Sequence, residues 1–139
     1  VQRGTVGTED EAFEKYLRDE GPAFVKTQWM TLPEAMRFIR ETEGVAVVAH
    51  PGRYNFAAPL TTIDLLEEFK ALGGDAIEVT TGSHFEAENE RYTRVALNMG
   101  FLASTGSDFH GCKPGRPEPG LQEPLPDYLP TVLDLLKDR

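Results

Sequence analysis

The sequence predicts an α/β fold in which parallel strands alternate with helices. Three short apolar runs, at residues 45–49, 76–79 and 101–104, are separated by stretches whose apolar residues recur at helical spacing. Their centres lie roughly 25–30 residues apart, which is the length that a strand–helix–strand crossover requires. One histidine follows each run, and ligands bind at the carboxyl ends of parallel strands. We therefore expect one polar site at that edge of the sheet.

Composition narrows the class of protein. The 139 residues suit one domain, with 40% apolar residues, 27% charged residues and a net charge of −9. A chain this acidic, with no run of Lys and Arg, does not resemble a general nucleic-acid-binding protein. The single cysteine, Cys112, excludes an internal disulfide and suits a reducing cytoplasm. No apolar stretch approaches the length of a membrane span, so we expect a cytoplasmic protein without a membrane segment or signal peptide.

Both ends of the chain are predicted to carry helices. Thr8, with a glutamate three residues later, forms a capping-box pattern at the start of an amphipathic helix that Gly21 ends. Thr31 repeats the pattern at the start of a second helix. Residues 111–127 are rich in proline, which predicts a long irregular connection, and residues 128–137 then form a closing helix.

The middle of the chain alternates between strands and helices. Residues 45–49 are apolar and rich in valine, which predicts a strand buried on both faces of a parallel sheet. A helix is expected from about residue 61 to 72, followed by a strand at residues 76–79. A helix at about residues 86–98, which a glycine ends, and a strand at residues 101–104 complete the pattern.

Asp108 and His110 form the clearest candidate for a functional site. They follow the third apolar run and are two positions apart, so on an extended chain they point to the same side. A carboxylate and an imidazole on one side can hold a transition-metal ion, with ligand distances of about 2.0–2.2 Å for zinc. The alternative is a polar turn, because Gly-Ser-Asp is common in turns.

The other two histidines follow the first and second runs. His50 precedes a Pro-Gly pair that directs the chain away from the strand and leaves the imidazole at the sheet edge. Arg53 is a planar cation that suits a phosphate or carboxylate, or else pairs with a local acid at the surface. His84 either contacts substrate or caps the following helix. Glu78 lies below the sheet edge, and we do not predict it to be a ligand.

Three segments together resemble a known family. Residues 49–54 (AHPGRY), 78–84 (EVTTGSH) and 106–111 (GSDFHG) are similar to the later motifs of the PHP (polymerase and histidinol phosphatase) family. The likeness extends over residues 22–139, in the same order and spacing. It is greatest to the members that remove a phosphate from 3′,5′-nucleoside bisphosphates and trim RNA 5′ ends.

The resemblance implies a fold and a metal site. It implies a distorted (βα)₇ barrel with up to three divalent metal ions, Mn, Fe or Zn, at the carboxyl ends of the strands. His50 would be a metal ligand from the third motif, and Asp108 and His110 would be ligands from the last. Arg53 and His84 would lie on the substrate side. The metals would activate a water molecule and neutralise the phosphoryl oxygens.

The early motifs of the family are absent here. They supply a His-x-His pair, and none of the three histidines of this chain forms one. We therefore expect residues 1–22 to be the end of an inserted helical region and residues 23–139 to be the C-terminal half of a PHP domain, with an incomplete metal site. The missing N-terminal half would be a partner, and open sheet edges invite self-association.

The expected function is that of a metal-dependent phosphoesterase, acting on a nucleotide phosphate or an RNA 5′ end and inactive as this fragment alone. A second hypothesis is a PHP-like scaffold that has lost its metals, and a third is an unrelated α/β binding module with structural histidines. The presence of His50, Asp108 and His110 favours the enzyme, because a decayed site has no need of them.

Overall fold

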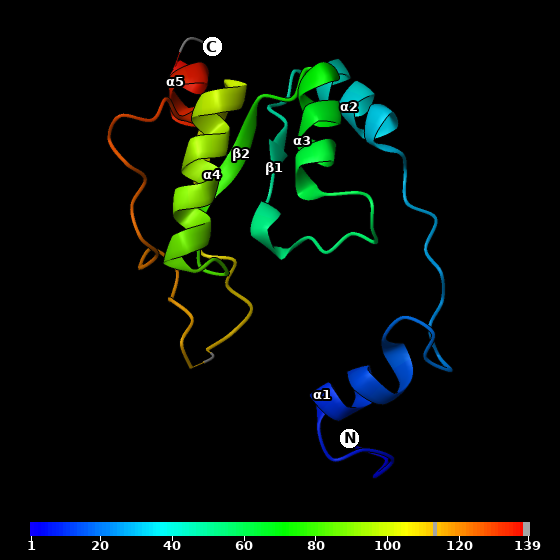
Figure 1. Ribbon diagram of the computed structural model, residues 1–139. Coiled ribbons are helices and arrows are strands. Elements are labelled where there is room, and N and C mark those ends of the chain that lie inside the picture. The colour runs from blue at the N-terminus through cyan, green and yellow to red at the C-terminus, as the bar shows by residue number, and fades with distance from the viewer. Residues whose placement is uncertain (113, 138–139) are drawn as a thin grey trace. The chain divides into compact units, whose positions relative to one another are not determined.

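A computed structural model describes residues 1–112 and 114–137 of the protein. The chain forms two compact units, Val1–Met30 and a second unit that begins at Thr31. All three strands, and the helices that pack on them, belong to the second unit (Figure 1). The residues that the sequence assigns to the site therefore all lie in the second unit.

The first unit contains one short helical segment. α1 (Glu9–Ala12) continues directly into a π-helix, η1 (Phe13–Leu17). As predicted, the Thr8 hydroxyl accepts a hydrogen bond from the N–H of Glu11, at 3.0 Å. The Glu11 carboxylate, however, accepts from the N–H of Gly7 at 2.7 Å and so does not complete the box. The helix is also shorter than predicted, because its apolar side chains stay half-exposed and packing does not support a longer one.

The second unit is built on a three-stranded parallel sheet. β1 (Val47–Val48), β2 (Ala76–Thr81) and β3 (Leu102–Gly106) pair in the order β1-β2-β3. The predicted α/β pattern of parallel strands is therefore confirmed. The register shifts between Glu78 and Thr80, so β2 carries a local irregularity just before its carboxyl end.

The first strand differs from its prediction. The sequence predicts that residues 45–49 are buried on both faces, but only Val47 and Val48 pair with β2, and Val47 is 40% exposed. The N–H of Ala46 donates to the Asp75 carboxylate at 2.8 Å instead of extending the ladder. Within the described residues no strand lies on the outer side of β1, so it is an edge strand and not a central one.

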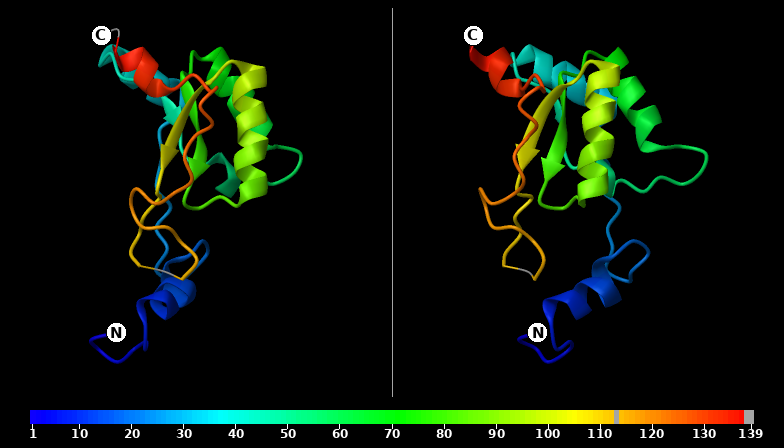
Figure 2. Two further views of the ribbon diagram at one scale, coloured as in Figure 1. Left: turned by 90° about the vertical axis from the view of Figure 1, so that its left-hand side faces the viewer. Right: turned by 60° about the vertical axis from the view of Figure 1, so that its left-hand side comes forward.

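Three predicted helices of the second unit are confirmed. α2 (Leu32–Glu41) begins at the predicted capping box, and Thr61 forms another at the start of α3 (Thr62–Ala71). α4 (Glu86–Met99) ends at Gly100, whose φ of +65° is the left-handed conformation that glycine adopts freely. Right-handed crossovers place α3 and α4 on the same face of a sheet whose strands follow in order, as Figure 2 shows.

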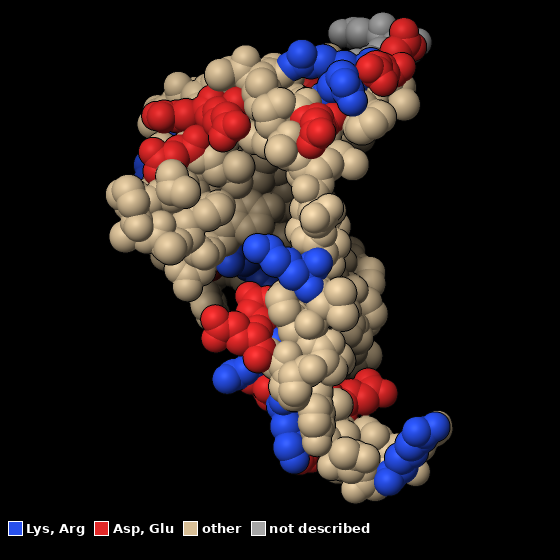
Figure 3. All heavy atoms as spheres, turned by 90° about the vertical axis from the view of Figure 1, so that its right-hand side faces the viewer, with Lys and Arg blue, Asp and Glu red and all other residues tan. Residues whose placement is uncertain are grey.

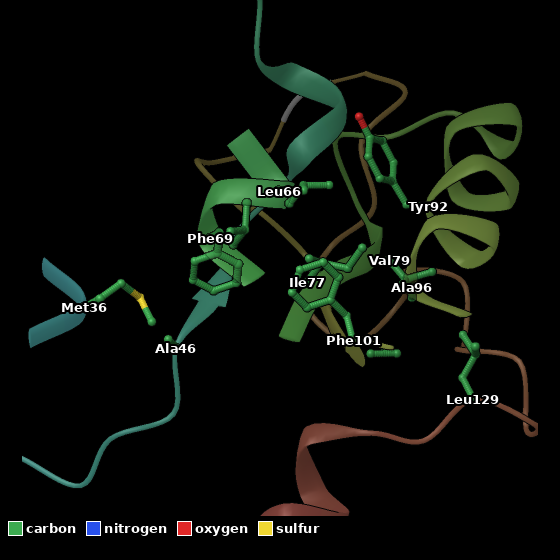
Figure 4. Packing of buried hydrophobic residues seen from close by; sticks show 12 residues of the cluster. Met36, Ala46, Leu66, Phe69, Ile77, Val79, Tyr92, Ala96, Phe101 and Leu129 are labelled. Carbon is green, nitrogen blue, oxygen red and sulfur yellow. The ribbon is translucent and has the colours of Figure 1, made fainter. Parts of the chain in front are cut away.

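The core fills the space between these helices and the sheet. Leu66 and Ile77 are fully buried, and the ring of Phe69 stacks on that of Phe101 with centroids 5.8 Å apart. Figure 4 shows how these side chains converge. The buried hydrophobic cluster consists of Met36, Ala46, Val48, Leu66, Phe69, Ile77, Val79, Tyr92, Ala96, Phe101, Ala103 and Leu129. The strands are thus held on one face by apolar packing, which keeps their carboxyl ends in place.

The closing helix is shorter than predicted. α5 (Val132–Lys137) begins four residues after the expected start at Tyr128. Residues 127–129 instead form a turn. The N–H of Ala103 then donates to the carbonyl of Pro130 at 2.8 Å, and Thr131 forms a parallel bridge with the outer edge of β3. Thr131 then donates its N–H to the Asp134 carboxylate at 2.9 Å and caps the helix. The free edge of β3 is therefore partly covered.

Charged side chains are spread over the surface. On the face that Figure 3 shows, Lys and Arg stand among Asp and Glu without forming a continuous basic band. None of the helices in the described part of the chain has the length and apolar character needed to cross a lipid bilayer.

We expect Leu66→Ala to destabilise the protein by about 2–5 kcal/mol, because it removes a fully buried side chain and leaves a cavity in the buried hydrophobic cluster. Urea unfolding followed by circular dichroism measures this change. Leu60, which is 61% exposed, provides the matched control, and Leu60→Ala should change the unfolding free energy by less than about 0.5 kcal/mol. Equal effects of the two substitutions would contradict the packing described above.

Candidate functional site

The carboxyl ends of the three strands lie at one edge of the sheet. Three segments leave the strands there: residues 50–53 after β1, 82–84 after β2 and 107–111 after β3, which we call the rim. Side chains join all three segments to one another. Arg53 donates to the carboxylate of Asp108, and the N–H of Gly52 donates to His84 Nε2. The structure thus places every predicted site residue on the rim.

His50 begins the first rim segment in a strained conformation. Its φ of +31° is in the left-handed region, which costs a non-glycine residue about 1–3 kcal/mol. Its N–H donates to the carboxylate of Glu78 at 2.6 Å, and its ring meets that of Tyr54 edge-on with centroids 5.9 Å apart. The Nδ1 atom of His50 is buried and has no hydrogen-bond partner within the described structure. An unpartnered buried imidazole nitrogen suits a metal ion or another ligand.

Glu78 reaches the rim although the sequence analysis leaves it out of the site. It faces the side of the sheet opposite Ile77, and its carboxylate extends past Gly106 to the N–H of His50. A Cβ atom at position 106 would meet that carboxylate, so the glycine leaves room for it. The period-two pattern of β2 indicates the direction of Glu78, but only the pairing of β2 with β3 shows that a glycine lies in its path.

Asp108 is the most connected residue of the rim. It also has a positive φ, +49°, and its side chain is only 9% exposed. Arg53 Nη1 lies 2.9 Å from Asp108 Oδ2 in an ion pair. Burial by itself raises the pKa of Asp108, but hydrogen bonds from Ser83 and Arg53 oppose it. With the positive charges of His50 and Arg53, they hold the pKa below its ordinary value. Asp108 is therefore a carboxylate at neutral pH.

His110 lies beside Asp108 and is largely exposed. Its Nδ1 is 2.8 Å from the Asp108 carbonyl oxygen and 3.5 Å from Oδ1. Because a carbonyl can only accept, Nδ1 carries the proton and Nε2 keeps its lone pair. Metal-binding histidines commonly show this arrangement, in which the second nitrogen donates to a carbonyl or carboxylate.

His84 holds the rim segment that follows β1. Its Nε2 accepts a hydrogen bond from the N–H of Gly52 at 3.0 Å, so the ring proton is on Nδ1, which lies 3.3 Å from the Val79 carbonyl. The ring stacks on Tyr92 with centroids 5.3 Å apart. A Cβ atom at position 52 would meet the imidazole, so the glycine permits this close approach. His84 therefore holds the turn that carries Arg53, and it does not cap α4, which begins after Phe85.

A cavity of about 230 Å³ opens at the rim. It is lined by Arg53, Ser107, Asp108, Phe109, His110, Gly111, Arg116 and Pro117. Arg116 is absent from the sequence-based site, because it lies in the proline-rich connection and no spacing links it to a strand. Its Nη1 donates to the carbonyl of Gly82 at 2.9 Å, which brings it to the rim. Cys112, close by in the sequence, is exposed and unpaired.

The rim fits part of a metal centre. The buried nitrogen of His50, the carboxylate of Asp108 and the free nitrogen of His110 are suitable donors for Mn, Fe or Zn. Within the described part of the chain, however, no three His, Cys, Asp or Glu side chains form a group that could hold a metal ion. The donor types fit the implied metal, but these three side chains do not meet as one group, and further ligands would have to complete the site.

Curated proteins related to the chain are phosphate-ester hydrolases and nucleases by name. The chain is 39% identical over 126 residues to a 3′,5′-nucleoside bisphosphate phosphatase from Chromobacterium violaceum, covering 91% of this chain and 44% of the relative. It is 36% identical over 110 residues to a 5′-3′ exoribonuclease from Haemophilus influenzae, covering 79% and 40%. The chain thus spans less than half the length of these relatives. No family model matches it.

Solved structures share the fold. A structure from C. violaceum described as an amidohydrolase, with bound sulfate and no metal, matches with a TM-score of 0.79 and 36% identity, covering 99% of this chain and 47% of that one. A Bifidobacterium adolescentis structure assigned as a metal-dependent phosphoesterase matches with a TM-score of 0.71 over 99% of this chain and 46% of that one. At 24% identity, the second likeness concerns the fold alone.

We expect Glu78→Gln to lower the pKa of Tyr54. Burial raises the pKa of the Tyr54 phenol, and the negative charge of Glu78 raises it further. The amide removes the charge but keeps an oxygen that can accept from the N–H of His50, so only the burial effect on the pKa remains. A pH titration of ¹³C-labelled tyrosine by NMR measures the change. The control Glu67→Gln, on the exposed side of α3, should leave the pKa of Tyr54 where it was.

Proposed function

We propose that the chain is the C-terminal half of a PHP-type domain in a metal-dependent phosphoesterase that hydrolyses a nucleotide phosphate or an RNA-end phosphate. The observation that carries the proposal is the meeting of Arg53, Asp108 and His110 at one cavity on the carboxyl edge of a parallel sheet. The names of the relatives support the same class of reaction. In this proposal, residues 1–22 are the end of an inserted helical region and residues 23–139 are the domain half.

We assign the metal ligands to His50, Asp108 and His110. Two of them, His50 and Asp108, have left-handed backbone conformations, and such strain is typical of sites where function decides the geometry. The Asp108 carboxylate is ionised, and the Nε2 of His110 is free to bind. When bound, Mn, Fe or Zn ions would lower the pKa of a water molecule and neutralise phosphoryl oxygens.

Arg53 and His84 serve the substrate in different ways. Arg53 presents a planar set of N–H donors beside Asp108, a geometry that matches the oxygens of a phosphoryl group. His84 acts through the turn that it holds at Gly52, and so it orients Arg53 toward the cavity. The protein would therefore align the phosphoryl group before the reaction begins, which reduces the entropic part of the barrier.

The chain alone provides only part of the proposed site. The matched region is less than half the length of each relative, and the remaining part would supply the other ligands and cover the open edge of β1. We therefore propose that the isolated chain is inactive and that its natural partner is that half. The exposed edge of β1 could instead pair with a second copy of the chain, so self-association competes with binding of the missing half.

The Arg53–Asp108 ion pair favours one alternative function. A guanidinium that neutralises the rim carboxylate can replace a metal ion structurally, as expected of a non-catalytic PHP-like scaffold. The two proposals differ in metal binding, because a scaffold with this pair would not exchange Arg53 for a divalent ion.

Titration with Mn²⁺, followed by electron paramagnetic resonance, separates these proposals. We expect weak and partial binding by the isolated chain, and Asp108→Asn should lower the affinity about 10-fold or more because it removes a charged ligand. The control Asp127→Asn, at an exposed position outside the rim, should have no effect. Absence of any binding would favour the scaffold, and tight binding of three ions would contradict an incomplete site.

A chimera tests the reaction. In it, this chain replaces the matching region of the C. violaceum phosphatase, and we expect release of phosphate from adenosine 3′,5′-bisphosphate in the presence of Mn²⁺. Asp108→Ala should reduce the rate more than about 100-fold, because loss of a direct ligand exceeds the 10–100-fold effect of its outer partners. Asp127→Ala should retain the rate. A chimera that folds and binds Mn²⁺ but releases no phosphate would refute the proposed function.

A further inference from the structure

The backbone pairing of β1 with β2 ends before His50. The last residue of β1 in the ladder is Val48. Two positions later, the N–H of His50 donates to a side chain, the carboxylate of Glu78, at 2.6 Å. A hydrogen bond from a backbone N–H to a carboxylate is charge-assisted and stronger than the neutral bonds of a ladder. Glu78 therefore takes the place of a backbone acceptor at the point where β1 ends.

Gly106 gives the carboxylate of Glu78 its room. Glu78 pairs with Ser104 of β3, and Gly106 lies two positions further along, on the same face of the sheet. The φ of Gly106 is not positive, so its backbone conformation does not require glycine. Within the described structure, a Cβ atom at position 106 would meet only the carboxyl group of Glu78 within 4 Å. The missing side chain at position 106 therefore serves the position of this carboxylate.

The conformation of His50 depends on support from its surroundings. Its φ of +31° is unfavourable for a residue with a side chain. The imidazole lies edge-on to the ring of Tyr54, with centroids 5.9 Å apart, and its Nδ1 is buried. Because backbone conformation sets the direction in which a side chain leaves the chain, a return of His50 to an extended conformation would turn the imidazole elsewhere. A bond that holds the N–H of His50 thus also holds its ring.

We propose that Glu78 is a positioning residue: in the space that Gly106 leaves, its carboxylate holds the backbone of His50 in the left-handed conformation and so fixes the direction of the imidazole. Glu78 acts through His50 and does not itself bind metal or substrate. Glu78 and Gly106 act as a pair, because the carboxylate cannot keep its place if position 106 carries a side chain. The use of the imidazole as a metal ligand rests on the proposed function, but its fixed direction does not.

NMR on the metal-free 139-residue chain tests this pair. Gly106→Ala should make the amide of His50 exchange with solvent about 10-fold faster or more, because a hydrogen bond to a charged group stabilises by at least that factor. The ring signals of His50 should lose the ring-current shift from Tyr54. The chain should stay folded, because the group that must move is the end of a flexible side chain. Gly7→Ala is the matched control, since a Cβ atom there would lie 3.5 Å from the carboxylate of Glu11, and it should leave His50 unchanged.

A double variant separates positioning from packing. Glu78→Ala should release the amide and ring of His50 as Gly106→Ala does. Adding Gly106→Ala to Glu78→Ala should have no further effect, because no carboxylate is left to displace. Glu78→Gln keeps an oxygen acceptor and should speed exchange less than Glu78→Ala. An unchanged His50 in Gly106→Ala, or additive effects in the double variant, would overturn the proposal.

The Mn²⁺ affinity of the chimera measures the consequence for the proposed function. Gly106→Ala should lower this affinity about 10-fold or more, as the loss of a partner that orients a metal ligand commonly does. An unchanged affinity in a variant whose His50 is released would overturn the positioning role. If the chimera binds no Mn²⁺ with or without the substitution, the metal site of the proposed function is refuted. The exchange rates and ring signals then still decide whether Glu78 holds His50.

Discussion

Parallel pairing of the three strands is the constraint on which the site depends. Because β1, β2 and β3 point in one direction, the segments that follow them emerge together. Apolar packing of α3 and α4 against one face holds this arrangement. Short polar links then join the strand ends, such as the N–H of His50 to Glu78 and the side chains of Arg53 and Asp108. Without the sheet, residues more than fifty positions apart in the chain would have no reason to meet.

Backbone strain and charge are concentrated where the chain leaves the sheet. His50 and Asp108 both adopt left-handed conformations, and each is held by a hydrogen bond or ion pair to another rim residue. Gly52 and Gly106 allow side chains to approach the backbone closely at the same place. The apolar core offsets the free-energy cost of this strain. Two arginines, Arg53 and Arg116, line the cavity, so the rim differs from the otherwise acidic chain. Such a combination is expected at a binding site and not at a structural turn.

Sequence reasoning was most successful where local chemistry decides the structure. Caps at Thr31 and Thr61 and the stop at Gly100 are local signals, so α2, α3 and α4 begin and end close to their predicted positions. β1 was predicted too long because residues 45–49, although they form an edge strand, have the apolar composition of a central strand. The predicted start of the closing helix was wrong, because the hydrogen bond between Ala103 and Pro130 joins residues that are distant in the sequence.

The sequence by itself determined the α/β alternation and identified His50, His84, Asp108, His110 and Arg53 as rim residues, because their positions after apolar runs follow from chain order alone. Only the tertiary structure decided how they are used: that Arg53 pairs with Asp108, and that His84 supports a turn. It also added Glu78 and Arg116 to the site. Glu78 comes to the rim through the register of the strands, and Arg116 through the course of the connection after β3. Hydrogen-bonding distances are set by packing across the sheet, and no local pattern in the chain encodes them.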